Sequence, residues 1–269
     1  EMSASLVGSE MCIRDRYNMG SNNDISLKAL AKINLGLDVV RRREDGYHEV
    51  RMIMQTIHLY DRLDIKRTKE PGIQIQTNLS FLPVNENNLI YKAAKLLMDE
   101  FSITDGVSVK LDKRIPVAAG MAGGSTDAAA MLIGVNRLFS LGLTKRQLME
   151  RGVQIGADVP YCIMRGTALA EGIGEALSPL PPMVKCPVLI AKPSISVSTK
   201  FVYQNLKLDD TTIHPDIDRL IDDIKAKNLH DIAAHMGNVL ETVTIPNYPV
   251  IDEIKKHMLS NGAVGAMMS

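Results

Sequence analysis

The sequence PVAAGMAGGSTDAAA, residues 116–130, joins a glycine-rich loop to the start of an alanine-rich helix. Its glycines leave backbone N–H groups open to a close anion, and a helix N-terminus adds roughly half a positive charge and unpaired donors. Ser125 and Thr126 are placed either to cap the helix or to reach a phosphate or Mg²⁺. The stretch has neither a Walker GK[ST] ending nor a GxGxxG pattern. The pattern therefore leaves two interpretations open: a phosphate cradle, or a flexible loop before a buried helix.

On both sides of this loop the sequence predicts strands and helices. From Ile25 to Val40 the odd positions are all apolar, a period of two that predicts a strand. Its opposite face would carry the polar residues Lys28, Lys32, Asn34 and Asp38. Asp45-Gly46 predicts a hairpin turn. Further strands are predicted over residues 47–65, 72–77, 107–111, 166–171 and 187–192, and helices over residues 88–101, 125–139, 144–153, 198–206, 216–227, 229–243 and 248–260.

The order of these elements predicts an α+β chain of two domains. The best linker is SPLPP, residues 178–182, because proline removes hydrogen-bond donors from a strand. We therefore expect an N-terminal domain over residues 19–180 and a C-terminal domain over residues 181–269.

The two ends of the chain carry expectations of their own. Residues 1–18 have neither helical nor strand periodicity, which predicts a non-native leader with Met19 as the initiator. The chain stops in GAVGAMMS, residues 262–269, a glycine-rich run that usually continues into a turn and a strand. This predicts a second domain that is incomplete at its end.

Composition narrows the class of protein. The 269 residues hold 31 Lys and Arg against 31 Asp and Glu, a balance that argues against a nucleic-acid or membrane-surface partner. No apolar run reaches the roughly 18 residues that a membrane helix needs. The three cysteines are scattered without CxxC spacing, which indicates a reducing, cytoplasmic compartment and no zinc site.

Two polar residues are candidates for chemistry. Asp158 lies in GADVP, between a predicted helix end and a strand, and Pro160 biases the residue before it away from helical geometry. This carboxylate could act as a general base or balance a cation, or simply form a turn or helix cap. Lys32 could face solvent, or it could pair with Asp158 and favour the ionised carboxylate. Asn34, two residues further along the strand, would present its amide to the same space.

The hairpin turn brings an aromatic ring and an imidazole together. Tyr47 and His48 directly follow Asp45-Gly46. Together they could stack on and hydrogen-bond a base or sugar. The alternative is an ordinary hairpin with a half-buried tyrosine and a surface histidine.

Five segments in this order resemble the GHMP small-molecule kinases: AKINLGLDV, EDGYHEV, PVAAGMAGGSTDAA, GADVP and EGIGE. The resemblance runs from about Ile25 to the C-terminus. It implies an N-terminal domain like ribosomal protein S5 domain 2, a ferredoxin-like C-terminal domain, and an active site between them. It implies phosphoryl transfer from the co-substrate ATP, with Mg²⁺, to the 2-hydroxyl of a cytidine diphosphate substrate in the non-mevalonate isoprenoid route.

The resemblance also assigns site residues. It places the catalytic lysine at Lys32 and the catalytic aspartate at Asp158. ATP-binding positions fall on Pro116, Val117, Ala118, Ala119, Gly120, Met121, Ala122, Gly123, Gly124, Ser125, Thr126, Lys113 and Asn88. Substrate-binding positions fall on Asn34, Tyr47, His48 and Tyr203, and Ser125 is a candidate Mg²⁺ ligand. Members commonly have glycines where this chain has Ala118 and Ala119, and a further glycine motif would follow Ser269.

Three alternatives stay open at this point. The chain could be another GHMP kinase, acting on homoserine, mevalonate or a sugar. It could be a non-catalytic nucleotide-binding relative, although a pure binder needs neither Lys32 nor Asp158. It could also be an unstable fragment. The sequence leaves the oligomeric state open between monomer and homodimer.

Overall fold

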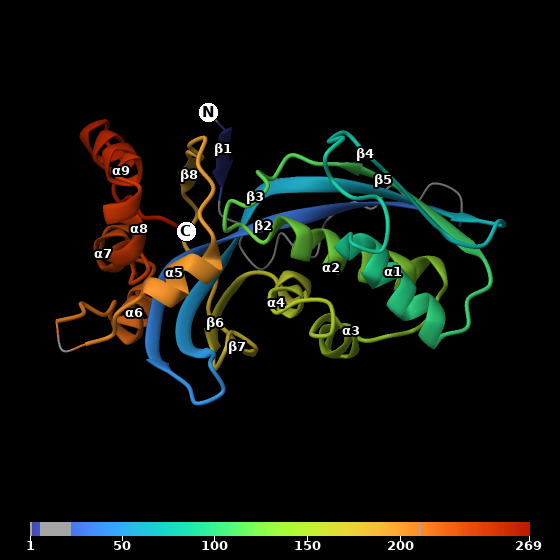
Figure 1. The fold of residues 1–269 in the computed structure, drawn as a ribbon, viewed down its shortest axis with the longest axis horizontal. Coiled ribbons are helices and arrows are strands. Elements are labelled where there is room, and N and C mark those ends of the chain that lie inside the picture. The colour runs from blue at the N-terminus through green and yellow to red at the C-terminus, as the bar shows by residue number, and fades with distance from the viewer. Residues whose placement is uncertain (1, 6–22, 210) are drawn as a thin grey trace.

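The computed structural model describes residues 2–5, 23–209 and 211–269, and its centre is a seven-stranded sheet. The strand order is β4-β5-β3-β2-β9, and β6 pairs with β3 and with β7 (Figure 1). The strands of this sheet are β2 (Asp24–Arg42), β3 (His48–Thr68), β4 (Ile73–Thr77), β5 (Gly106–Asp112), β6 (Thr167–Glu171), β7 (Ala176–Pro179) and β9 (Gly237–Asn238). The predicted α+β class is confirmed.

The longest two strands form the predicted hairpin. β2 and β3 pair antiparallel through Arg42 and His48, and Asp45-Gly46 lies in the turn between them. Gly46 has φ +86°, a left-handed conformation that glycine adopts without a steric cost. The turn closes by a hydrogen bond from the Gly46 N–H to the Arg43 carbonyl at 3.1 Å.

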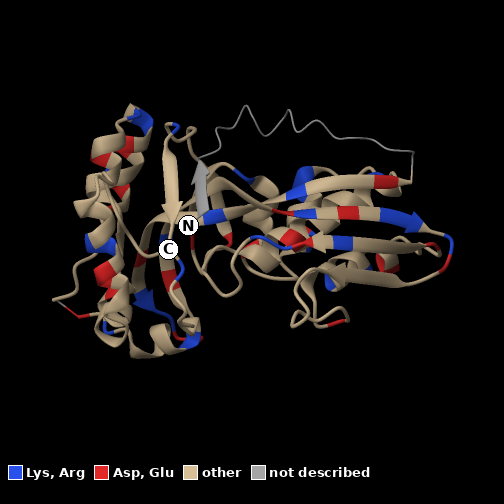
Figure 2. Cartoon of the chain, turned by 90° about the horizontal axis from the view of Figure 1, so that it is seen from above, with Lys and Arg blue, Asp and Glu red and all other residues tan. Residues whose placement is uncertain are grey.

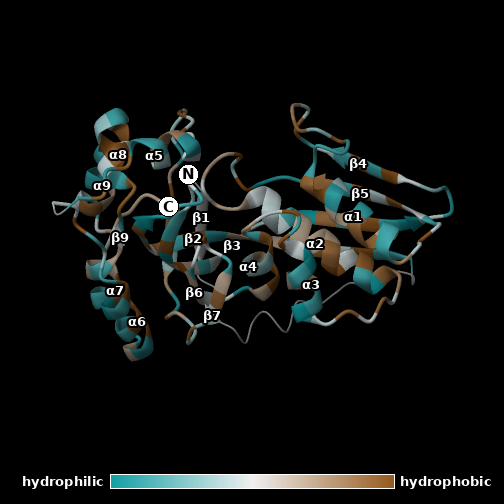
Figure 3. Cartoon of the chain, turned by 60° about the horizontal axis from the view of Figure 1, so that its bottom comes forward, coloured by the Kyte–Doolittle hydropathy of each residue, from teal (hydrophilic) through white to brown (hydrophobic). Residues whose placement is uncertain are grey.

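Four helices cover one face of the sheet: α1 (Leu89–Glu100), α2 (Gly123–Leu138), α3 (Lys145–Gly152) and α4 (Val159–Met164). Figure 3 shows apolar residues along α2, where this helix lies over the sheet. The predicted cap Thr144 is confirmed, because its side chain accepts from the Gln147 N–H in a capping box. The main core lies in this layer, and its fully buried members include Leu63, Ile65, Leu97 and Leu132.

The prediction that four polar residues share one face of β2 is wrong. Lys28 is exposed, whereas Lys32, Asn34 and Asp38 are buried. The register against β3 shifts between Leu30 and Lys32 and again after Asn34. The first shift places two extra residues on β3 and the second places one extra residue on β2, and such irregularities turn the side chains that follow. Ala31 and Leu35 accordingly belong to a second core, while Leu27 and Leu37 belong to the main one.

The C-terminal part packs beside the bend of β2 and β3. It contains β8 (Pro187–Ile190) and helices α5 (Thr199–Asn205), α6 (Ile217–Ala226), α7 (Leu229–His235), α8 (Glu241–Asn247) and α9 (Val250–Ser260). The prediction of one helix over residues 229–243 is wrong. Met236 leaves the helix with ψ 137°, and Gly237–Asn238 then pairs with β2 as strand β9.

The second core joins both parts of the chain. Ala31, Leu35 and Ile53 from the hairpin pack with Ile217 and Leu220 of α6. Gly36 provides the room, because a Cβ there would lie 2.9 Å from both α6 side chains. The division near residue 180 stays a prediction.

Near the N-terminus, β1 (Met2–Ser5) pairs antiparallel with β8, although the sequence predicted no regular structure there. Residues 6–18 and Met19 lie outside the described residues, so the leader stays a prediction.

Candidate active site

The glycine-rich loop ends in an uncapped helix N-terminus. Ala122 has φ +53° and makes no side-chain cap for α2, which begins at Gly123. Among the described residues, no partner is found for the N–H groups of Gly123, Gly124 and Ser125. The predicted loop thus presents three free donors at the positive end of a 16-residue helix, an arrangement suited to bind an anion.

The loop keeps its turn without the glycines that the family commonly has. Gly120 has φ +70°, and Ala118 has φ +53° in the same left-handed region. An L-residue other than glycine is strained there, at a cost of about 1–2 kcal/mol. Ala119 is half-buried against the second core.

Lys113 lies beneath this helix N-terminus in a buried cluster of three charges. Its ammonium pairs with Asp61 and, at 2.8 Å, with Asp127. Asp61 also accepts from the N–H groups of Arg114 at 2.5 Å and Ile115 at 2.8 Å. The second oxygen of Asp127 has no partner among the described residues. Burial raises the pKa of Asp127 well above its usual range, and the neighbouring Asp61 charge adds to this.

The loop is also fastened to the strand that carries Lys32. The Lys32 N–H donates to the Met121 carbonyl at 3.2 Å. The Thr126 hydroxyl donates to the Leu30 carbonyl at 2.8 Å. These bonds lie on both sides of the register shift between Leu30 and Lys32, so they fix β2 against the glycine loop at this point.

Lys32 and Asp158 interact electrostatically in this region. Lys32 is 7% exposed, and its ammonium lies 3.3 Å from Asn34 Oδ1. Burial lowers the pKa of Lys32, and the charge of Asp158 acts in the opposite direction. Asp158 therefore acts electrostatically on Lys32, and Asn34 lies beside the lysine; the pairing of Lys32 with Asp158 in catalysis stays a prediction.

Asp158 is held in place by the short helix α4, which the sequence did not predict. Asp158 is its N-cap residue, yet its side chain makes no capping hydrogen bond and so stays available. Tyr161 anchors the helix: its hydroxyl donates to the Gly166 carbonyl at 2.7 Å and lies 3.0 Å from Thr56 Oγ1. Cys162 is buried near Asp158, and burial raises the pKa of its thiol.

An aromatic pair lies within electrostatic reach of Asp158. The rings of His48 and Tyr203 are 4.9 Å apart and tilted by 42°. Burial, followed by the charge of Asp158, raises the pKa of Tyr203. Burial also lowers the pKa of His48, with a contribution from Arg42. Tyr47 is 61% exposed on the hairpin.

Asn88 and Lys113, predicted near the nucleotide, make contacts within the protein. Asn88 caps α1, because its Oδ1 accepts from the Ile90 N–H at 2.8 Å. Its amide donates to the Pro83 carbonyl at 2.7 Å. Lys113 is engaged by its two carboxylates. Their role as direct ATP ligands stays a prediction.

The C-terminal residue Ser269 also reaches the site. Its hydroxyl accepts a hydrogen bond from the Asn34 N–H at 2.9 Å. Its carbonyl oxygen lies 2.5 Å from where a Cβ on Gly120 would be. Sequence reasoning missed Ser269, Asp61 and Asp127 as members of the site. The signal for Asp127 was its place inside the quoted glycine motif, directly before Ala128, Ala129 and Ala130.

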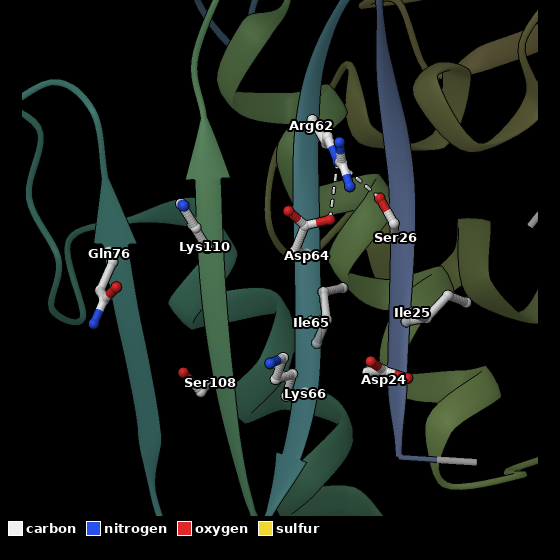
Figure 4. A pocket seen from close by; sticks show the side chains of 10 residues that line it. All are labelled: Asp24, Ile25, Ser26, Arg62, Asp64, Ile65, Lys66, Gln76, Ser108 and Lys110. Atoms are coloured by element: carbon white, nitrogen blue, oxygen red, sulfur yellow. Dashed lines mark hydrogen bonds and ion pairs between the residues drawn. The ribbon is translucent and has the colours of Figure 1, made fainter. Parts of the chain in front are cut away.

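A groove of about 670 Å³ lies elsewhere, on the face of the sheet away from α1 and α2 (Figure 4). Its charged side chains include Arg62, which pairs with Asp64, and Lys110. Figure 2 shows acidic and basic residues interspersed along these strands, as expected for a solvated surface. None of the candidate site residues lines this groove.

Two further features concern metals and membranes. In the described part of the chain, no group of three His, Cys, Asp or Glu residues is arranged to hold a metal ion. In the same part, no helix has both the length and the apolar character of a membrane span.

Comparisons with known proteins place this site in a class. Residues 88–166 match the GHMP kinases N terminal domain. The chain is 62% identical, over 91% of its length and 85% of the relative, to 4-diphosphocytidyl-2-C-methyl-D-erythritol kinase of Lachnospira eligens. It is 60% identical to the enzyme of that name from Lachnoclostridium phytofermentans, over 91% and 84% of the two chains.

A solved structure agrees with these relatives. The crystal structure of a 4-(cytidine 5'-diphospho)-2C-methyl-D-erythritol kinase superposes with a TM-score of 0.73 and 31% identity, covering 88% of this chain and 83% of the other. The fold and these matches thus define a GHMP kinase, an enzyme that phosphorylates a small molecule. The chain belongs to the family of 4-diphosphocytidyl-2-C-methyl-D-erythritol kinases.

Proposed function

We propose that this chain transfers the γ-phosphoryl group of ATP to the 2-hydroxyl of 4-diphosphocytidyl-2-C-methyl-D-erythritol. The reaction would belong to non-mevalonate isoprenoid synthesis in the cytoplasm. The observation that carries the proposal is the buried ammonium of Lys32, within electrostatic reach of Asp158 and tied through its own backbone to the glycine loop. The names of the relatives at 62% and 60% identity support the choice of substrate.

The loop over residues 116–126 binds the phosphates of ATP. The N–H groups of Gly123, Gly124 and Ser125 lie free at the positive end of α2 and donate to the phosphate oxygens. Lys113 adds a positive charge beneath the same helix end. Asn88 lies at the start of α1, and we assign it to the rim of the nucleotide site.

One side chain at this helix start, that of Ser125, is suited to bind Mg²⁺. Ser125 Oγ is half-buried at the helix start and has no hydrogen-bond partner among the described residues. Mg²⁺ commonly takes one or two protein ligands and fills its other positions with phosphate oxygens and water. When bound, the ion would neutralise charge on the phosphates. Ser125 is the residue of this chain that would hold it.

Asp158 and Lys32 act on the attacking hydroxyl. Asp158 orients this hydroxyl and accepts its proton as the phosphoryl group transfers. Lys32 stabilises negative charge on the transferring group. The free side chain of Asp158, which caps no helix end, is consistent with this role.

The cytosine end of the substrate is recognised by aromatic residues. The tilted pair of His48 and Tyr203 offers a ring surface and an imidazole next to Asp158. Tyr47 lies exposed on the hairpin and closes over the base. Asn34 orients the erythritol part beside Lys32.

A comparison of acceptor alcohols tests this proposal. The full chain is incubated with Mg²⁺, labelled ATP and, in turn, the cytidine substrate, homoserine or mevalonate. We expect transfer to the cytidine substrate at a kcat/KM at least about 100-fold higher than to either competitor, since a site built for polar groups rejects analogues that lack them. Preference for homoserine or mevalonate would assign the chain to another GHMP activity.

A further inference from the structure

The backbone of Met268 is held by two side chains from the turn between β9 and α8. The Met268 N–H donates to Glu241 Oε1 at 2.7 Å. The Asn238 amide donates to the Met268 carbonyl at 2.9 Å. The N–H and the carbonyl of Met268 are thus both hydrogen-bonded to side chains that are only three positions apart in the sequence. These two bonds fix the path of the chain into Ser269.

These two side chains are themselves firmly placed. Asn238 pairs with Leu37 of β2 in the short parallel strand β9, and its Oδ1 accepts from the Leu240 N–H at 3.0 Å. The other oxygen of Glu241 forms an ion pair with Lys255 of α9 at 2.5 Å. The Glu241 and Lys255 side chains are 16% and 21% exposed, so water competes only partly for this pair.

These contacts form a continuous series that begins and ends on β2. β2 positions β9 through Leu37, and Asn238 of β9 holds Met268. The next residue, Ser269, accepts a hydrogen bond from the Asn34 N–H of β2. The Ser269 carbonyl lies over Gly120 of the glycine loop. The C-terminal residues therefore bridge the strand that carries Lys32 and the loop that binds phosphate.

We propose that Asn238 and Glu241 are positioning residues for the phosphate cradle. They hold Met268 and Ser269 between Asn34 and Gly120, so that the glycine loop keeps one spacing from β2 when ATP binds. Neither residue touches ATP or the acceptor. The inference rests on the proposed function, because Asn34 and Gly120 are assigned to that site.

The test compares Glu241→Ala with Glu241→Gln and a matched control in the full chain. Glutamine keeps an acceptor oxygen for the Met268 N–H and a similar shape. The control is Asp252→Ala, which removes the exposed i,i+4 ion pair of Asp252 with Lys256 on the same helix, α9. Three quantities are measured: hydrogen exchange of the peptide covering residues 262–269, the Kd of ADP with Mg²⁺, and the separate KM values for ATP and the cytidine substrate.

For Glu241→Ala we expect the Met268 amide to exchange about tenfold faster, the size of effect expected when a hydrogen bond to a charged group is lost. The Kd of ADP and the KM for ATP should rise by a similar factor, about tenfold. The KM for the cytidine substrate should rise less than the KM for ATP, because Ser269 reaches the substrate-binding residues through the backbone N–H of Asn34 and not through its side chain. Glu241→Gln should recover most of the loss, and Asp252→Ala should match the parent chain.

Two results would overturn the inference. One is unchanged exchange of the 262–269 peptide in Glu241→Ala. The other is faster exchange with an unchanged Kd of ADP, which would make Glu241 a stabilising residue without influence on the cradle. Neither hydrogen exchange nor the Kd of ADP depends on the acceptor alcohol. If the proposed substrate is wrong, the comparison of acceptor alcohols will show it, and these two measurements can still be interpreted.

Discussion

The ammonium of Lys113 lies 2.8 Å from the position that a Cβ on Gly123 would occupy. The lysine cannot easily move aside, because Asp61 and Asp127 hold it on two sides. We therefore expect Gly123→Ala to lower the free energy of unfolding by about 1–3 kcal/mol, the usual cost of inserting a methyl group into a packed interior. Urea titration measures the change.

Gly124 gives the matched control for this substitution. A Cβ there meets only Leu89 Cδ1, at an ordinary contact distance of 3.4 Å. Gly124→Ala should leave the unfolding free energy within about 0.5 kcal/mol, as expected for a partly exposed position. It should instead raise the KM for ATP, because the new methyl group stands where phosphate approaches the free N–H groups. Equal loss of stability in both variants would contradict the placement of Lys113.

Lys32→Met should stabilise the fold while abolishing turnover. Burial lowers the pKa of Lys32, which means that the buried charge costs free energy. Replacing it with an apolar side chain should add about 1–3 kcal/mol to the unfolding free energy near pH 7. The gain should shrink as the pH rises toward 10.5, the ordinary value, because the parent lysine then loses its proton. Lys28→Met, at an exposed position on the same strand, should show no such gain.

Because of Asp127, we expect the free energy of unfolding to fall as the pH rises. Its pKa in the folded state is raised above 3.8, so the folded chain binds more protons than the unfolded chain in the window above that value. The parent protein should lose stability as the pH rises through this window, and Asp127→Asn should not. The stability of Asp127→Asn relative to the parent should thus increase from pH 4 upward. A difference that stays flat over this pH range would contradict a proton on Asp127.

Tyr47→Ala tests recognition of the cytosine end. Removing a stacking ring commonly costs about 1–3 kcal/mol per base, so the KM for the cytidine substrate should rise by about tenfold or more while the KM for ATP stays constant. Tyr60→Ala is the control, since Tyr60 contacts Lys28 on another part of the hairpin. An unchanged KM for the cytidine substrate would favour another GHMP kinase activity.

Local patterns predicted the parts of this molecule that are locally determined. The period of two in β2, the Asp45-Gly46 turn, the Thr144 cap and the start of α2 all follow from short stretches of sequence. The register shifts between β2 and β3 were not predictable in this way, because they depend on how two strands pair and not on either strand's own pattern.

The parts that could not be predicted depend on contacts distant in sequence. Helix α4 has six residues, too few to show a period, and Tyr161 fixes it by bonding near Thr56 and Gly166. Asp61 lies 52 positions from Lys113, and Ser269 lies 235 positions from Asn34. Only the folded chain brings these residues together, whereas Lys32 and Asp158 were assigned by the resemblance of their motifs to the GHMP kinases, and their catalytic roles stay predictions.

The most direct test of the account is the turnover of Asp158→Asn with ATP, Mg²⁺ and the cytidine substrate. Asparagine keeps the shape but accepts no proton, so kcat should fall by about 10²–10⁴-fold, the usual contribution of general-base catalysis. The variant should still fold with a cooperative melting transition, because the Asp158 side chain caps no helix, although its melting temperature should fall because the buried Lys32 loses an offsetting charge. Near-normal kcat in a folded Asp158→Asn protein would contradict the assignment of Asp158 as the base.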